Sequence, residues 1–100
     1  MLKKDLLELC LLQLLAGGDK YGYEVLTPLR AAFPDTQESA IYAILRQLCR
    51  EGATERYQGE TSGGPARKYY RLTEAGQARH AALLEIWRKT RDALAALGIA

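Results

Sequence analysis

Residues 39–52 read SAIYAILRQLCREG. Its aliphatic side chains recur at i, i+3, i+4 and i+7, as Ile41, Ile44, Leu45 and Leu48. The opposite face carries Ser39, Tyr42, Arg46 and Arg50. This spacing is typical of an amphipathic α-helix with one buried face. We predict a helix that starts near Gln37 and stops at Gly52, since glycine is common just after a helix C-terminus.

A second helix is predicted immediately before this one, from about Tyr21 to Phe33. Its residues at core spacing are Val25, Leu26, Leu29 and Phe33. Pro28 falls inside it, where the ring removes one backbone hydrogen bond and should kink the helix or start a new turn, at about 3 kcal/mol. Pro34 and Asp35 end it. Two helices joined by a short turn, the second with a basic outer face, form a helix-turn-helix.

A hairpin follows the second of these helices. Residues 54–58 and 67–72 are predicted strands, and GETSGGPA at residues 59–66 is the tip between them. A helix-turn-helix followed directly by a hairpin is a winged helix, so the fold class is mainly α (α+β). Residues 1–72 are predicted to form this winged helix-turn-helix domain.

Two more helices flank the domain. The first, from Asp5 as N-cap to Ala16, is leucine-rich around nearly its whole circumference. It must be buried on more than one side, and another subunit is the expected second partner. The last begins at Thr73 and runs to about Leu97. Its heptad seam is Gly76, His80, Leu83, Trp87, Thr90, Leu94 and Leu97. We expect residues 73–100 to be a dimerisation helix that packs against another protomer.

Basic residues concentrate in one window, although the formal net charge of the 100 residues is only +2. Residues 46–71 contain three glutamates and six cations, namely Arg46, Arg50, Arg56, Arg67, Lys68 and Arg71. Cations on the helix and hairpin are placed to meet the phosphates of double-stranded DNA. From charge alone, a solvated surface explains them equally well.

The remaining reactive residues do not suggest an enzyme. Cys10 and Cys49 match no zinc or redox spacing and are expected to be reduced. His80 is the only histidine, so no metal or cofactor is expected, and no nucleophile–base pair is evident. The apolar run at residues 6–15 is too short to span a bilayer and lacks a signal cleavage site. We expect a cytoplasmic protein with no membrane partner.

Three motifs together resemble the PadR family of transcriptional regulators. They are YGYE at residues 21–24, SAIYAILRQL at residues 39–48 followed by Glu51 and Gly52, and GGPARKYYRLTEAG at residues 63–76. The short chain with one C-terminal helix is similar to the family's compact second subfamily. The resemblance implies a homodimeric repressor of an inverted-repeat operator. The helix from Gln37 to Gly52 would enter the major groove, and the hairpin of residues 54–72, the wing, would follow the backbone or minor groove.

The chain departs from the family pattern at several positions. Gln37 stands where Ser or Asn is usual, and Ala40 stands where Thr is frequent, so base preference does not transfer. Ala53 and Thr54 replace larger apolar residues, which suggests a looser core where the hairpin begins. Pro28 is unusual in the second helix.

The predicted DNA contacts are Tyr21, Gln37, Ser39, Tyr42, Arg46, Arg67 and Lys68. Tyr42 is expected to face outward and reach a phosphate or base edge. Tyr21 begins a helix, where phosphates often bind, with a purely structural role equally open. Tyr69 and Tyr70 alternate across a strand, and one of them is expected in the core.

The resemblance also implies a planar, apolar or aromatic effector stacked on Trp87 at the dimer interface. The expected ligand-binding residues are Trp87, Leu83, Thr90, Leu7 and Leu11. The expected dimer contacts are Leu83, Trp87, Leu94 and Leu97. Alternatively, Trp87 simply fills the interface. Two other functions stay open: a winged-helix module that binds an acidic protein, and a dimer that chiefly binds small molecules and binds DNA weakly.

Overall fold

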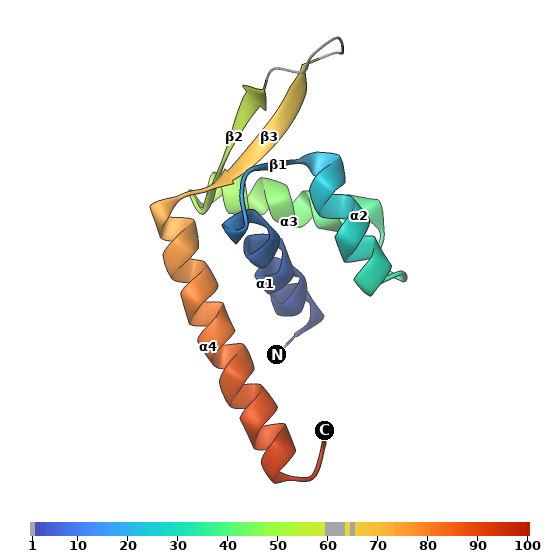
Figure 1. The fold of residues 1–100 in the computed structure, drawn as a ribbon, viewed down its shortest axis with the longest axis vertical. Coiled ribbons are helices and arrows are strands. Elements are labelled where there is room, and N and C mark those ends of the chain that lie inside the picture. The colour runs from blue at the N-terminus through green and yellow to red at the C-terminus, as the bar shows by residue number, and fades with distance from the viewer. Residues whose placement is uncertain (1, 60–63, 65) are drawn as a thin grey trace.

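A computed structural model describes residues 2–59, 64 and 66–100; residues 60–63 and 65, in the predicted hairpin tip, lie outside the described residues. The elements are α1 (Lys3–Ala16), β1 (Lys20–Tyr21), α2 (Gly22–Ala32), α3 (Glu38–Arg50), β2 (Thr54–Gly59), β3 (Arg67–Leu72) and α4 (Glu74–Ala96) (Figure 1). This arrangement confirms the predicted winged helix-turn-helix with a long C-terminal helix.

The helix-turn-helix consists of α2 and α3. The inner stripe of α3 is buried as predicted, through Ile41, Ile44, Leu45 and Leu48. Gln37 is its N-cap residue, and Gly52 follows its end with a φ of 77°, a left-handed conformation that favours glycine. α2 continues through Pro28 without interruption. Of the two outcomes predicted at Pro28, a kink or a new turn, the new turn is not found.

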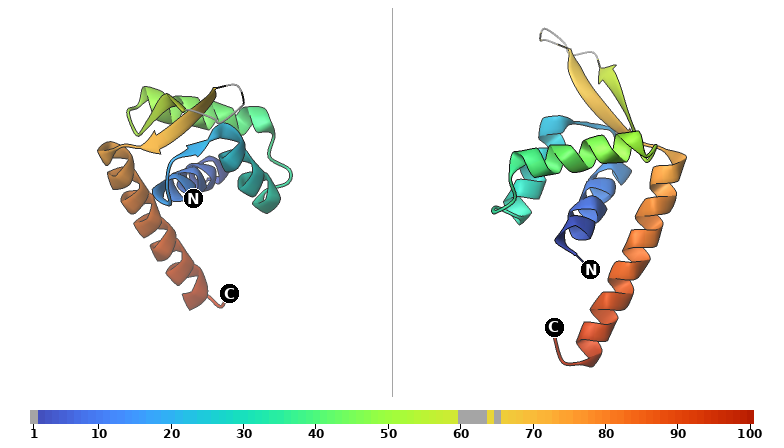
Figure 2. Two further views of the ribbon diagram at one scale, coloured as in Figure 1. Left: turned by 45° about the horizontal axis from the view of Figure 1, so that its top comes forward. Right: turned by 180° about the vertical axis from the view of Figure 1, so that it is seen from behind.

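α1 lies at the centre of the molecule and contacts α2, α3, α4 and β3 (Figure 2). Its buried residues are Leu7, Leu9, Leu11, Leu12 and Leu15. The chain's own elements therefore provide most of the burial that we expected from a second subunit. α1 also begins earlier than predicted. Leu2 is the N-cap residue, and its backbone N–H donates to the Asp5 carboxylate at 3.2 Å.

The three strands form one antiparallel sheet in the order β1-β3-β2. In its register, Tyr69 lies opposite Tyr21 on one side and Tyr57 on the other. The sequence does not predict β1, because two residues are too few to show the alternation of a strand. Tyr21 therefore ends this strand and is also the N-cap residue of α2, one position before its first helical residue, as the predicted start near Tyr21 requires. Tyr70 is buried in the core, which confirms the prediction for one of the two adjacent tyrosines.

The start of α4 packs closely on the turn between α3 and β2. The Thr73 hydroxyl caps the helix: it accepts from the Gly76 N–H at 3.0 Å and donates to the Gly52 carbonyl at 2.6 Å. A Cβ on Gly76 would overlap the Ala53 carbonyl. Ala53 and Thr54 are almost fully buried. The looser core predicted here is therefore not found, because the small residues let α4 approach.

The first half of α4 packs along α1, whereas its second half extends past the rest of the molecule (Figures 1 and 2). Arg79 connects α4 to the other helices. It forms ion pairs with Glu8 of α1 at 3.5 Å and with Glu51, the residue after α3, at 3.1 Å. Every residue from 91 to 100 is exposed. In the part of the chain that the structure describes, no helix combines the length and apolar character needed to cross a membrane.

Candidate nucleic-acid interface and apolar pocket

The exposed face of α3 carries Ser39, Arg46 and Arg50, with Gln37 just before the helix. Tyr42 departs from the predicted arrangement. It is half-buried, and its hydroxyl lies against the first turn of α2, where a Cβ on Gly22 would be 3.1 Å away. Burial and then the Glu38 carboxylate raise the pKa of Tyr42. Tyr42 therefore points toward α2 and not outward with Ser39 and Arg46.

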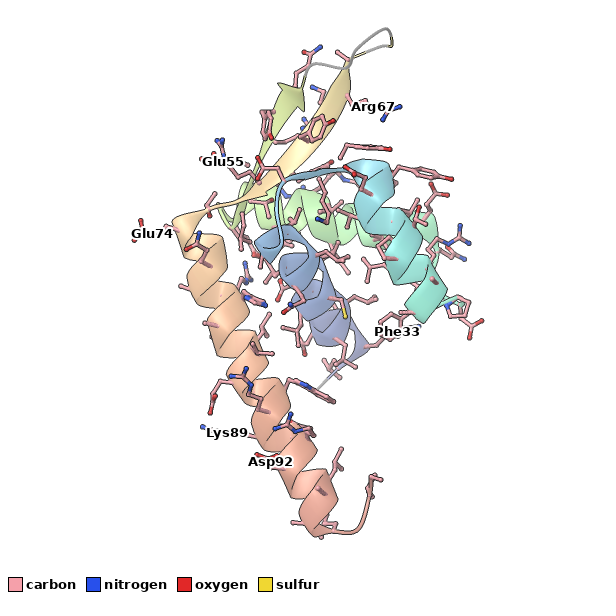
Figure 3. The ribbon with its side chains drawn as sticks, viewed as in Figure 1. Phe33, Glu55, Arg67, Glu74, Lys89 and Asp92 are labelled. Atoms are coloured by element: carbon pink, nitrogen blue, oxygen red, sulfur yellow. The ribbon has the colours of Figure 1, made fainter. Side chains whose placement is uncertain are left out.

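Tyrosine rings form a row across the outer face of the sheet, in the order Tyr21, Tyr69 and Tyr57. The Tyr69 ring centre is 5.8 Å from each neighbour, edge-on to Tyr21 and stacked with Tyr57. The Arg67 guanidinium lies over Tyr21 at 4.5 Å, and that of Arg71 over Tyr57 at 5.3 Å. Figure 3 shows Arg67 on the wing, beside the first turn of α2. A cation–π contact orients a guanidinium without neutralising its charge.

The charges of the wing are unevenly neutralised. Arg71 pairs with Glu55 at 2.6 Å. The Tyr57 hydroxyl donates to Asp19 at 2.6 Å, and this bond raises the pKa of Tyr57. The predicted DNA contacts Arg67 and Lys68 are exposed, and neither pairs with a carboxylate of the described residues. As neighbours on a strand they point to opposite faces, so the wing carries a cation on each side.

Arg50 and Arg56 belong to the basic window of the sequence, but neither was a predicted DNA contact. Both line a cleft between α3 and the sheet, together with Arg46. Arg56 lies opposite Tyr70 in the β2–β3 register. Residues opposite each other in an antiparallel pair share a face, so the burial of Tyr70 is the signal that places Arg56 toward α3.

An apolar pocket of about 450 Å³ opens between α1, α2 and α4. Its lining is Leu6, Leu9, Cys10, Gln13, Leu14, Pro28, Leu29, Ala32, Leu84 and Trp87. Burial raises the pKa of the Cys10 thiol. The predicted residues Leu7 and Leu11 do not line this pocket, because both are buried in the core. Trp87 does lie beside α1, as expected, but the residues of α1 that share the pocket with it include Leu6 and Cys10 instead of Leu7 and Leu11.

The predicted seam on α4 divides into two parts. Its first part faces the chain's own core: Gly76 is buried, Leu83 packs on the core, and the His80 Nε2 lies 2.7 Å from Gln13 Oε1. Leu84, not Leu83, joins Trp87 at the pocket.

The second part of the seam has no such neighbours. Thr90 does not line the pocket, and its hydroxyl donates to the Ile86 carbonyl at 2.9 Å. Leu94 and Leu97 are 38% and 79% exposed. Among the described residues, no cluster of three or more His, Cys, Asp or Glu side chains could hold a metal ion.

Comparison with known proteins assigns the sequence and the fold to one family. The model of the transcriptional regulator PadR-like family matches residues 11–82. The chain belongs to this family. An uncharacterised protein of Lysinibacillus sphaericus is 30% identical to this PadR-like chain over 89 residues, which cover 86% of the chain and 82% of that protein. The PadR-like family is one of transcriptional regulators, not of enzymes.

Solved structures of PadR-like and other regulators share the fold. A PadR-like transcriptional regulator from Bacillus cereus has a TM-score of 0.84 at 30% identity, covering 92% of this chain and 90% of its own. A Streptococcus transcriptional regulator gives 0.85 at 28%, covering 95% and 94%. Bacillus subtilis PadR in complex with operator DNA gives 0.66 at 25%, covering 78% of this chain and 46% of that one.

Proposed function

We propose that this PadR-like protein is a dimeric repressor that binds an inverted-repeat operator in double-stranded DNA. The observation that carries the proposal is the position of three cations that make no ion pair with any described residue, Arg46 on α3 and Arg67 and Lys68 on the wing. In winged-helix proteins the second helix of the helix-turn-helix reads the major groove, and basic side chains fix the protein on the phosphates. The similarity to a PadR solved with operator DNA supports the same use of this surface.

Exposed apolar side chains near the end of α4 support a homodimer. They are Ile86, Leu94, Leu97 and Ile99, between 38% and 79% exposed. Exposed apolar side chains of this size favour association, and a second copy of α4 would bury them. Two protomers would place their α3 helices about 34 Å apart, in successive major grooves. An operator with two inverted half-sites matches that symmetry.

A planar apolar small molecule is the proposed effector. The pocket of about 450 Å³ is large enough for such a ligand and is lined mostly by apolar side chains. Trp87 offers an aromatic face for stacking. The pocket lies between α4 and the helices α1 and α2. A ligand that displaces α4 would therefore alter the distance between the α3 helices of the two protomers. The repressor would then leave its operator.

The test is binding of the purified protein to the DNA upstream of its own gene, against a scrambled duplex, across a salt series. If each protomer neutralises about four phosphates, log K for the dimer should fall with log salt at a slope of about −7. The promoter should bind more tightly than the scrambled duplex. A slope near zero, or equal binding to both duplexes, contradicts an operator-binding repressor. Absent binding would favour a module that recognises an acidic protein.

A further inference from the structure

We propose that the cleft between α3 and the sheet is a binding site for one DNA backbone phosphate. Its lining is Arg46, Cys49 and Arg50 from α3, Arg56 from β2 and Tyr70 from β3. The proposal rests on the DNA-binding function proposed above. It deepens that function by placing one phosphate between α3 and the wing, and it gives Arg50 and Arg56 a role.

The positive charge of the cleft favours the binding of an anion. Its lining contains three arginines and no carboxylate. None of the three makes an ion pair with a carboxylate of residues 2–59, 64 and 66–100. The Arg50 Nη2 donates to Gln47 Oε1 at 2.7 Å, and this neutral partner orients the guanidinium while its charge remains. Guanidinium groups bind two oxygens of one phosphate in a planar fork, which makes a phosphodiester the best-matched anion.

The floor of the cleft joins α3 to β2, the two elements that carry its arginines. Tyr70 is only 6% exposed and lies opposite Arg56 in the sheet. The Cys49 Sγ and Thr54 Oγ1 atoms, 3.0 Å apart, join the end of α3 to the start of β2. Groups held in place before binding lose less freedom when the ligand arrives. The volume of about 410 Å³ leaves room for bridging water beside a phosphate.

The position of the cleft selects which phosphate it would bind. When α3 occupies a major groove and the wing occupies the adjacent minor groove, one sugar-phosphate strand separates the two grooves. That strand must pass between α3 and the wing, where the cleft lies. A contact there would add affinity and fix the register of the protein, but it would carry no base information.

The test compares two variants that each remove one positive charge. Arg56→Gln removes a cation of the cleft, at an exposed position on β2. Arg88→Gln, the control, removes a cation outside the cleft, at an exposed position on α4. Fluorescence anisotropy with promoter and scrambled duplexes across a salt series should show a less steep slope for the R56Q dimer, by up to about 1.8, since each neutralised phosphate contributes about 0.9 and each protomer has one cleft. Affinity should fall by the same factor on both duplexes. R88Q should keep the wild-type slope.

A second experiment locates the contact. Methylphosphonate linkages that neutralise one phosphate at a time should weaken the wild type at the strand between the two grooves, and the same linkage should have little effect on R56Q. Thermal melting of R56Q at the wild-type temperature serves as the folding control. A wild-type slope for R56Q, or a loss confined to the promoter duplex, overturns the phosphate site while the repressor proposal stands. Absence of salt-dependent binding by the wild type overturns both.

Discussion

The guanidinium of Arg67 lies 4.5 Å from the centre of the Tyr21 ring, so a residue at the start of the helix-turn-helix holds a cation of the wing. β1 makes this contact possible, because it pairs Tyr21 opposite Tyr69 at the edge of the hairpin. An unrestrained arginine loses rotamer freedom when it binds a phosphate, and this loss weakens binding. The contact with Tyr21 restricts Arg67 before DNA arrives.

Replacing Tyr21 with leucine should therefore weaken operator binding by the dimer about five- to thirtyfold, because an exposed cation–π contact contributes about 0.5–1 kcal/mol in each of the two protomers. Fluorescence anisotropy at fixed salt measures the change. The same substitution in an R67Q background should cause no further loss, since the contact is already absent. An equal loss in both backgrounds would mean that Tyr21 touches DNA itself.

Elements with a local signal could be predicted from the sequence. α3 has a complete apolar stripe with Gly52 after its end, and α4 has Thr73 as its cap, so both starts were predicted within one or two residues. β1 has no such signal. Its two residues are a strand only because they pair with β3, which lies far along the chain.

The directions of several site side chains could not be predicted. α1 is apolar on nearly every side, so periodicity does not say which residues face Trp87. Leu6 and Cys10 do, whereas Leu7 and Leu11 pack in the core. Tyr42 lies at the border of the α3 stripe. The space beside Gly22, which comes from a different helix, decides its direction.

Gly76→Ala should destabilise the protein, because its Cβ would overlap the backbone carbonyl of Ala53. Overpacking of this kind costs about 1–3 kcal/mol, and each kcal/mol lowers the melting temperature by about 4–8 °C in a domain of this size. Gly17→Ala is the matched control. Gly17 has a φ of −80°, and a Cβ there meets only the Leu14 carbonyl at 3.4 Å. If both variants melt together, α4 does not press on the turn before β2.

Acid should weaken the connection between α3 and α4. Hydrogen bonds from Gln47 and then Arg79 lower the pKa of Glu51. Because the folded-state pKa lies below the unfolded one, this stabilisation is present above the ordinary glutamate pKa of about 4.3 and is lost as pH falls through the folded value. Between about pH 6 and pH 3, the melting temperature of the wild type should fall more steeply than that of E51Q. If the melting temperatures of the wild type and E51Q fall in parallel with pH, the Glu51 carboxylate does not stabilise the connection between α3 and α4.

Trp87 is the only tryptophan of the chain, so its fluorescence reports on the apolar pocket. A planar aromatic such as acridine should quench it. Ala32→Leu adds bulk to the pocket wall and should weaken the apparent affinity about fivefold or more, since overpacking an apolar site costs about 1–3 kcal/mol. Ala31→Leu changes an exposed neighbour outside the lining and should have no effect. Quenching that is unchanged in A32L would place the aromatic elsewhere.

Leu94 and Leu97 should determine the oligomeric state, because both are exposed on the second part of the α4 seam. The double variant L94E L97E places two charges in the proposed interface, and sedimentation should show a monomer. Its DNA-binding slope should fall to about half of the dimer value, because one protomer neutralises half of the phosphates.

The control A95E A96E adds the same charge on the other side of α4, since successive helical residues are rotated by about 100°. It should remain dimeric and keep the full slope. If L94E L97E sediments as a dimer, the protomers associate through another surface, and α4 loses its proposed role. If L94E L97E is monomeric but keeps the full slope, one protomer carries all the phosphate contacts, and the two-half-site operator is contradicted instead.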